Sequence, residues 1–269
     1  MPGMLSPEIL RDGLQTKTFG RKIYSFETID STNSCARTLA ACWAEEGTVV
    51  LSEEQTAGRG RLGRAWVSTP AENLTFSVVL RPQITPDIMN ILSLLVAVGV
   101  ARGLKEHAGV QVHCKWPNDI LFRGRKLAGI LLEGALSGDR VESVIAGIGL
   151  NVNQESFPED LQSRATSLAL ASGHYHDRPK LFKGILASLE DEYLTQAGLG
   201  FKNVVNRWLE HAPMIGKRIT VDSSGAEIEG TVRGISNSGG LIVASQSGEH
   251  TFLAGDVTIL DMEPYASGD

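Results

Sequence analysis

The fold of this chain is decided at the stretch Lys126-Leu127-Ala128-Gly129-Ile130-Leu131-Leu132-Glu133, an apolar run that predicts a strand. Gly124 marks a hairpin turn before it, and Ile120-Leu121-Phe122 forms a short strand before that turn. A second apolar run, residues 141–150, predicts the next strand. Because strands joined by short turns pair in antiparallel fashion, we expect a mixed, mainly antiparallel sheet with helices on one side, an α+β domain.

The segments on either side of this hairpin predict two domains. Further strands are expected near residues 21–28, 48–52 and 74–80, and helices near residues 31–43, 87–107, 180–195 and 201–209. From Met214 onward the apolar runs shorten and glycines become frequent, which predicts a small closed barrel of about five strands. We therefore expect one domain over residues 1–212, with residues 1–20 as a short N-terminal extension, and a second over residues 213–269.

The composition of the chain excludes several classes of protein. A net charge of −6 provides no global basic field of the kind that nucleic-acid-binding proteins use. Three cysteines without a C-x-x-C pair indicate neither a disulfide framework nor a zinc site. The N-terminus does not have the pattern of a signal peptide, and the apolar run at residues 91–101 is shorter than the ~20 residues that span a bilayer. We expect a cytoplasmic protein with reduced thiols and no membrane association.

One run is rich in glycine and arginine: Gly58-Arg59-Gly60-Arg61-Leu62-Gly63-Arg64-Ala65-Trp66. Glycines let the backbone approach a ligand, arginines match phosphate or carboxylate groups, and the tryptophan offers a surface for stacking. The glycine spacing fits the dinucleotide fingerprint, but this run leads into a further strand instead of opening a helix, which excludes that motif. We predict a loop that closes over a phosphate-bearing ligand; a mobile surface loop with solvated arginines is the alternative.

Two polar clusters lie at the ends of other predicted elements. Ser31-Thr32-Asn33 opens a helix, where its side chains either cap the helix or bind polar ligand atoms. Lys115-Trp116-Pro117-Asn118-Asp119 combines a cation, a ring, an amide and a carboxylate. Asp119 suits Mg²⁺, which prefers one or two carboxylates together with phosphates, although Asn118-Asp119 is also a common turn pair.

Two further candidates lie on predicted strands. Lys126 begins an otherwise apolar strand beside Gly129, so its ammonium can reach a carboxylate or a phosphate, or lie in solvent at the strand end. The run Gly147-Ile148-Gly149-Leu150-Asn151-Val152-Asn153 ends a strand with side-chain amides that can recognise a purine or a ribose, or form a turn.

Each of these motifs, taken alone, has a simple structural explanation. Such explanations do not account for the order in which the motifs follow one another along the chain. The ordered set comprises Ser31-Thr32-Asn33, residues 55–66, residues 115–119, residues 126–131 and residues 147–151. In this order the set closely resembles the biotin protein ligases, over about residues 23–260. The resemblance implies their class II synthetase-like catalytic domain and their SH3-like C-terminal barrel. Bifunctional members carry an N-terminal winged helix-turn-helix. Residues 1–20 are too short for such a domain, so we expect the monofunctional type and no DNA binding.

The resemblance implies a two-step reaction. Biotin and MgATP give biotinyl-5′-AMP, and a lysine of an apo biotin carboxyl carrier domain then takes the biotin. The implied biotin-binding residues are Ser31, Thr32, Asn33, Gln55, Arg59, Gly60, Arg61, Lys126 and Gly129. The implied ATP-binding residues are Arg61, Arg64, Trp66, Lys115, Asn118 and Asn151. Lys126, Arg59 and Arg61 are the implied catalytic residues, and Asp119 is the expected ligand of Mg²⁺.

Other functions stay open on the sequence alone. A lipoate-type acyl-adenylate ligase of the same fold family is the nearest alternative, although Gln55 and the arginine run favour biotin. A non-catalytic nucleic-acid-binding module is another, which the net charge of −6 disfavours. A third is a small-ligand sensor without turnover. Family members differ in whether they form homodimers, so the resemblance allows a homodimer without requiring one.

Overall fold

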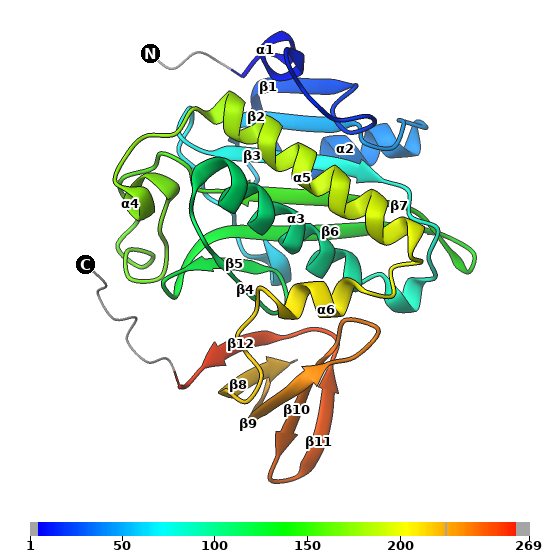
Figure 1. The fold of residues 1–269 in the computed structure, drawn as a ribbon, viewed down its shortest axis with the longest axis vertical. Helices are drawn as coiled ribbons and strands as arrows, with labels where there is room; N and C mark the ends of the chain where they lie inside the picture. The colour runs from blue at the N-terminus through cyan, green and yellow to red at the C-terminus, as the bar shows by residue number, and fades with distance from the viewer. Residues whose placement is uncertain (1–4, 224, 262–269) are drawn as a thin grey trace.

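The computed structural model describes residues 5–223 and 225–261, which form a larger α+β part and a smaller all-β part (Figure 1). A seven-stranded sheet runs through the larger part in the order β1-β2-β3-β7-β6-β5-β4. Its strands are β1 (Ile23–Ile29), β2 (Val49–Gln55), β3 (Leu74–Leu80), β4 (His113–Lys115), β5 (Asp119–Phe122), β6 (Arg125–Ser137) and β7 (Arg140–Leu150). Only β1 and β2 pair in parallel, so the predicted mixed, mainly antiparallel sheet is confirmed.

The hairpin of β6 and β7 lies at the centre of the sheet. Its ladder runs from Ala128 opposite Leu150 to Ser137 opposite Arg140. Residues 143–150 of β7 are buried throughout, because the strand has neighbours on both edges and is covered on both faces. The hairpin thereby brings Gly129 directly opposite Gly149, a pair that shapes the floor of the site described below.

Two long helices cover one face of the sheet. The helices of the larger part are α1 (Pro7–Arg11), α2 (Thr32–Ala41), α3 (Ile91–Ala108), α4 (Leu168–Ser172), α5 (Arg178–Gly198) and α6 (Val204–Leu209). Helix α3 packs closely on α5, since a Cβ on Gly99 would lie only 2.8 Å from Leu189 Cα. Every helix in the described part of the chain is too short or too polar to cross a membrane.

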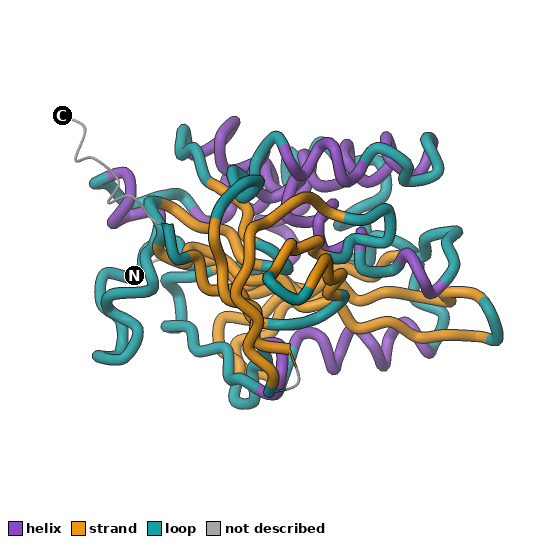
Figure 2. Tube along the Cα trace, turned by 90° about the horizontal axis from the view of Figure 1, so that it is seen from below, coloured by secondary structure: helices purple, strands orange, loops and turns teal. Residues whose placement is uncertain are grey.

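Helix α2 covers the opposite face, which corrects the expectation of helices on one side only. Ala36 and Ala40 of α2 pack on Val50, Val79 and Ile145 of the sheet. These strand residues alternate with neighbours that face α3 and α5, so both faces of the central strands are apolar and both need cover. Figure 2 shows helices on either side of the central strands.

The smaller part is a five-stranded antiparallel sheet, as predicted for the C-terminal barrel. Its strands are β8 (Arg218–Ser223), β9 (Ala226–Ile235), β10 (Leu241–Ser245), β11 (Gly248–Phe252) and β12 (Asp256–Ile259), in the order β11-β10-β9-β8-β12. Among the described residues no ladder joins β11 to β12, so hydrogen bonding does not close the barrel. Trp116 connects the two parts, because its buried Nε1 donates to Gly239 O at 2.9 Å.

Candidate active site

The seven-stranded sheet borders a cavity of about 860 Å³, a size typical of small-molecule sites. The end of β2, the arginine loop, the turn between β4 and β5 and the face of the β6–β7 hairpin line it, together with residues of β12. The cavity brings together all the residues for which the sequence predicts a ligand or metal role: Ser31, Thr32, Asn33, Gln55, Arg59, Gly60, Arg61, Arg64, Trp66, Lys115, Asn118, Asp119, Lys126, Gly129 and Asn151.

The N-terminus of α2 contributes neutral hydrogen-bonding groups to this cavity. Ser31 caps the helix, and its side chain accepts from Ser34 N. Gln55 Oε1 accepts from both Thr32 N at 2.7 Å and Thr32 Oγ1 at 3.0 Å. Ser77 Oγ lies 2.8 Å from Thr32 Oγ1. Because Oε1 of Gln55 is engaged by the protein, its Nε2 is the end that can donate to a ligand.

The arginine loop is a small hairpin. Arg59 and Ala65 form an antiparallel bridge, and Gly60 N donates to Arg64 O at 2.6 Å. A 3₁₀ turn, Arg61–Gly63, forms the tip, with Gly63 at a φ of +72°. A side chain is strained at that φ, which explains the glycine there.

The three arginines of the loop contact two regions of the protein. Arg59 Nη2 lies 3.1 Å from Ser34 Oγ, to which it donates, and 3.3 Å from Glu133 Oε1. Arg61 Nη1 donates to Gly255 O at 3.2 Å, and burial lowers the pKa of this guanidinium. Arg64 forms an ion pair with Asp256. Two of the three arginines therefore contact the C-terminal part.

Trp66 lies flat on the β6–β7 hairpin. A Cβ on Gly149 would overlap its ring, and a Cβ on Gly129 would lie 3.2 Å from its Cζ3. The paired glycines thus make room for the indole on the sheet. Its Nε1 is buried and has no hydrogen-bond partner among the described residues.

Lys126 and Asp119 form an ion pair within the cavity, with Nζ 2.6 Å from Oδ1. The ammonium also lies 5.8 Å from the centre of the Trp66 ring. Lys115 lies nearby on β4, where burial lowers the pKa of its ammonium, opposed by the charge of Asp119. Two of the predicted cations, Lys126 and Lys115, therefore lie close to the predicted carboxylate of Asp119.

Two predicted ligand residues are engaged mainly by the protein. Asn151 is buried, and its Nδ2 donates to Thr166 O at 3.0 Å. Asn118 Nδ2 donates to Ile130 O at 2.7 Å, which leaves its Oδ1 facing Arg61 Nη1 at 3.5 Å. These amides hold the cavity wall in place, and a ligand would meet only their remaining polar atoms.

Several cavity residues have no signal in the sequence. Asp256 comes from β12, and a loop residue, Asp160, comes from the segment that precedes α4. The same segment joins Lys126, since Lys126 N donates to Arg164 O at 2.7 Å. Their place in the site depends on how distant segments pack, which no local motif encodes.

Comparison with known proteins assigns the family. Residues 25–151 match the Biotin/lipoate A/B protein ligase family, and residues 214–260 match the Biotin protein ligase C terminal domain. The Bifunctional ligase/repressor BirA of Bacillus spizizenii is 39% identical over 260 residues, which cover 96% of this chain and 80% of that protein. The chain belongs to the biotin protein ligase family. The Biotin--[acetyl-CoA-carboxylase] ligase of Paracoccus denitrificans is 37% identical over 234 residues. The aligned region covers 85% of this ligase and 96% of that protein.

Solved structures agree with this membership. A biotin protein ligase from Aquifex aeolicus in complex with biotin and ATP has a TM-score of 0.74 at 29% identity, covering 89% of this chain and 98% of that one. The Leishmania major ligase in complex with biotinyl-5-AMP has a TM-score of 0.59 at 25% identity, covering 90% and 99%. The predicted biotin protein ligase activity and fold are confirmed, in preference to the lipoate-type ligase and the non-catalytic module.

Proposed function

We propose that this ligase joins biotin to ATP in the cavity and then transfers the biotin to a lysine of a biotin carboxyl carrier domain. In the first step, a carboxylate oxygen of biotin attacks the α-phosphorus of ATP, and pyrophosphate leaves. In the second step, the lysine amine attacks the acyl carbon of biotinyl-5′-AMP, and AMP leaves. The complexes of relatives with biotin and ATP, and with biotinyl-5-AMP, support this order of events.

The observation that carries the proposal is that one cavity combines neutral hydrogen-bonding groups with a cluster of cations. Thr32 and Gln55 offer neutral donors and acceptors, which suit the ureido ring of biotin. Lys126, Arg61 and Lys115 line the same cavity. There they offset the repulsion between a carboxylate and a triphosphate, and they stabilise the charge of the transition state.

The remaining predicted roles belong to Lys126, the arginines of the loop and Trp66. Lys126 contacts the carboxylate of biotin and the α-phosphate, after exchanging its contact with Asp119 for these anions. Arg59 and Arg61 hold the carboxylate and the phosphate, and Arg64 reaches the pyrophosphate. Trp66 forms the adenine side of the cavity. Loops that close over ligands exclude water, which protects the mixed anhydride of biotinyl-5′-AMP from hydrolysis.

Mg²⁺ enters with ATP in this proposal, and Asp119 is the carboxylate that would hold it. No group of three His, Cys, Asp or Glu residues able to hold a metal occurs in residues 5–223 and 225–261. Asp119, as a carboxylate in a cavity proposed to accept a triphosphate, nevertheless fits Mg²⁺, which is commonly bound by one or two carboxylates plus phosphate oxygens. When bound, the ion neutralises phosphate charge.

Exchange of labelled pyrophosphate into ATP tests the first step. We expect exchange that depends on biotin, because reversal of the first step returns the label to ATP. Lipoate should give none, since it has no ureido group to pair with Thr32 and Gln55. Exchange with lipoate but not with biotin would overturn the proposal. Tight binding of biotin without any exchange would favour a sensor without turnover.

A further inference from the structure

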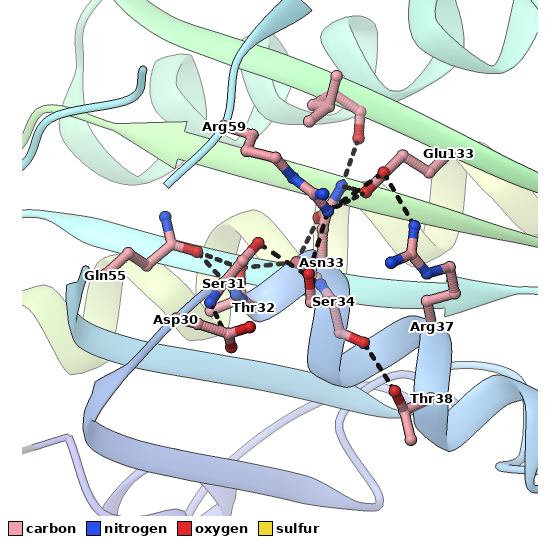
Figure 3. Close-up of polar contacts among 12 residues, drawn as sticks. Asp30, Ser31, Thr32, Asn33, Ser34, Arg37, Thr38, Gln55, Arg59 and Glu133 are labelled. Carbon is pink, nitrogen blue, oxygen red and sulfur yellow. Dashed lines mark hydrogen bonds and ion pairs between the residues drawn. The ribbon is translucent and has the colours of Figure 1, made fainter. Parts of the chain in front are cut away.

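Glu133 of β6 carries a carboxylate on which side chains from two other segments converge (Figure 3). Asn33 Nδ2 donates to its Oε2 at 2.7 Å. Arg37 Nη1 approaches its Oε1 at 3.4 Å, and Arg59 Nη2 approaches the same oxygen at 3.3 Å. Glu133 therefore contacts two residues that line the cavity, Asn33 and Arg59, as well as Arg37 on the outer side.

The amide of Asn33 is fully used in these contacts. Its Oδ1 accepts from Ser77 Oγ at 2.6 Å, and its Nδ2 donates to Leu131 O at 3.3 Å in addition to Glu133. A Cβ on Gly147 would overlap this amide, so the sheet leaves room for it. Asn33 thus joins the first turn of α2 to β3 and β6, instead of presenting a free group to biotin.

The charge of Glu133 lies between two guanidinium groups. The side chain of Glu133 is 24% exposed, whereas those of Arg37 and Arg59 are 55% and 41% exposed. Without the carboxylate, the two arginines would share no counter-ion, and like charges repel. Arg59 uses Nη2 for Glu133 and Ser34, which leaves its other N–H groups to bind an anion.

From these contacts we infer that Glu133 is a positioning residue for the binding of biotin. Its carboxylate holds Arg59 by one end of the guanidinium, so that the other end faces the carboxylate of biotin. It also anchors Asn33, and with it the turn that carries Thr32. This inference rests on the proposed function, since Arg59 is assigned to the carboxylate of biotin there.

Calorimetric titration of the full chain with biotin tests the inference. Glu133→Gln keeps an oxygen for Asn33 but loses the charge, so we expect the Kd for biotin to rise about tenfold, the size of a lost charge-assisted hydrogen bond. The KM for ATP in pyrophosphate exchange should stay within about twofold, because the defect lies on the biotin side. Glu142→Gln, at an exposed position on β7, is the matched control and should bind biotin as the wild type does.

A double-mutant cycle separates positioning from a general structural role. In an Arg59→Ala background, Glu133→Gln should weaken biotin binding by less than about twofold, because its target is already absent. Equal losses in both backgrounds, or wild-type binding by Glu133→Gln alone, would overturn the inference. Absence of biotin binding by the wild-type chain would instead refute the proposed function.

Discussion

Replacement of Lys126 by alanine is expected to slow the formation of biotinyl-5′-AMP by about 10²–10³-fold, the typical effect of removing one donor that stabilises transition-state charge. The ammonium lies in the cavity 2.6 Å from Asp119 and close to Trp66. In the proposed function it touches both the carboxylate of biotin and the α-phosphate. Alanine removes this charge and leaves the carboxylate of Asp119 facing the incoming anions.

The fold should survive this substitution, because the backbone of Lys126 makes the contacts that hold its strand. Its N donates to Arg164 O at 2.7 Å, and its O accepts from Thr166 N at 2.9 Å. Rapid-quench measurement of biotinyl-5′-AMP checks the rate, and far-UV circular dichroism checks the fold. Lys105→Ala, at an exposed position on α3, is the control and should form the adenylate normally. A normal burst of adenylate in Lys126→Ala would remove Lys126 from the mechanism.

The second large effect is expected on stability. Arg178→Met should lower the free energy of unfolding by about 3–5 kcal/mol, because it leaves the carboxylate of Glu53 buried without its counter-ion. The two side chains are only 3% and 7% exposed, and Arg178 Nη1 lies 2.6 Å from Glu53 Oε2. The same nitrogen donates to Asn73 O at 3.0 Å, so the pair ties the start of α5 to β2 and to the residue that precedes β3.

Urea denaturation measures this loss. Arg140→Met is the matched control, since Arg140 is exposed at the start of β7, and it should change stability by less than about 0.5 kcal/mol. The double variant Glu53→Leu with Arg178→Met should recover part of the loss, because no charge is then left buried. Unfolding of Arg178→Met at the urea concentration of the wild type would show that the pair is not needed for stability.

The sequence predicts much of this molecule because its decisive signals are local. The hairpin around Lys126 and the long helix α3 follow from short runs of apolar residues. The site residues lie in motifs whose order along the chain resembles one family, and all of these residues line the same cavity. The motifs also include glycines with clear steric reasons, such as Gly149 beneath the ring of Trp66.

What the sequence does not predict depends on contacts between distant segments. Strand β3 is buried at every position, and its neighbours Val78 and Val79 pack on opposite faces of the sheet, so its pattern alone does not say which helix covers which face. The contact of Arg64 with Asp256 requires the C-terminal sheet to dock beside the loop. Glu133 is one acidic residue among the 31 Asp and Glu residues of the chain, and only the fold brings it to Arg59.

The central claim is that this chain attaches biotin to protein, and mass spectrometry of an apo biotin carboxyl carrier domain tests it most directly. The carrier is incubated with the full chain, biotin and MgATP. The predicted result is a mass increase equal to one biotin less one water, located on a single lysine and absent when ATP is omitted. An unmodified carrier, under conditions in which an established biotin protein ligase modifies the same domain, would contradict the claim.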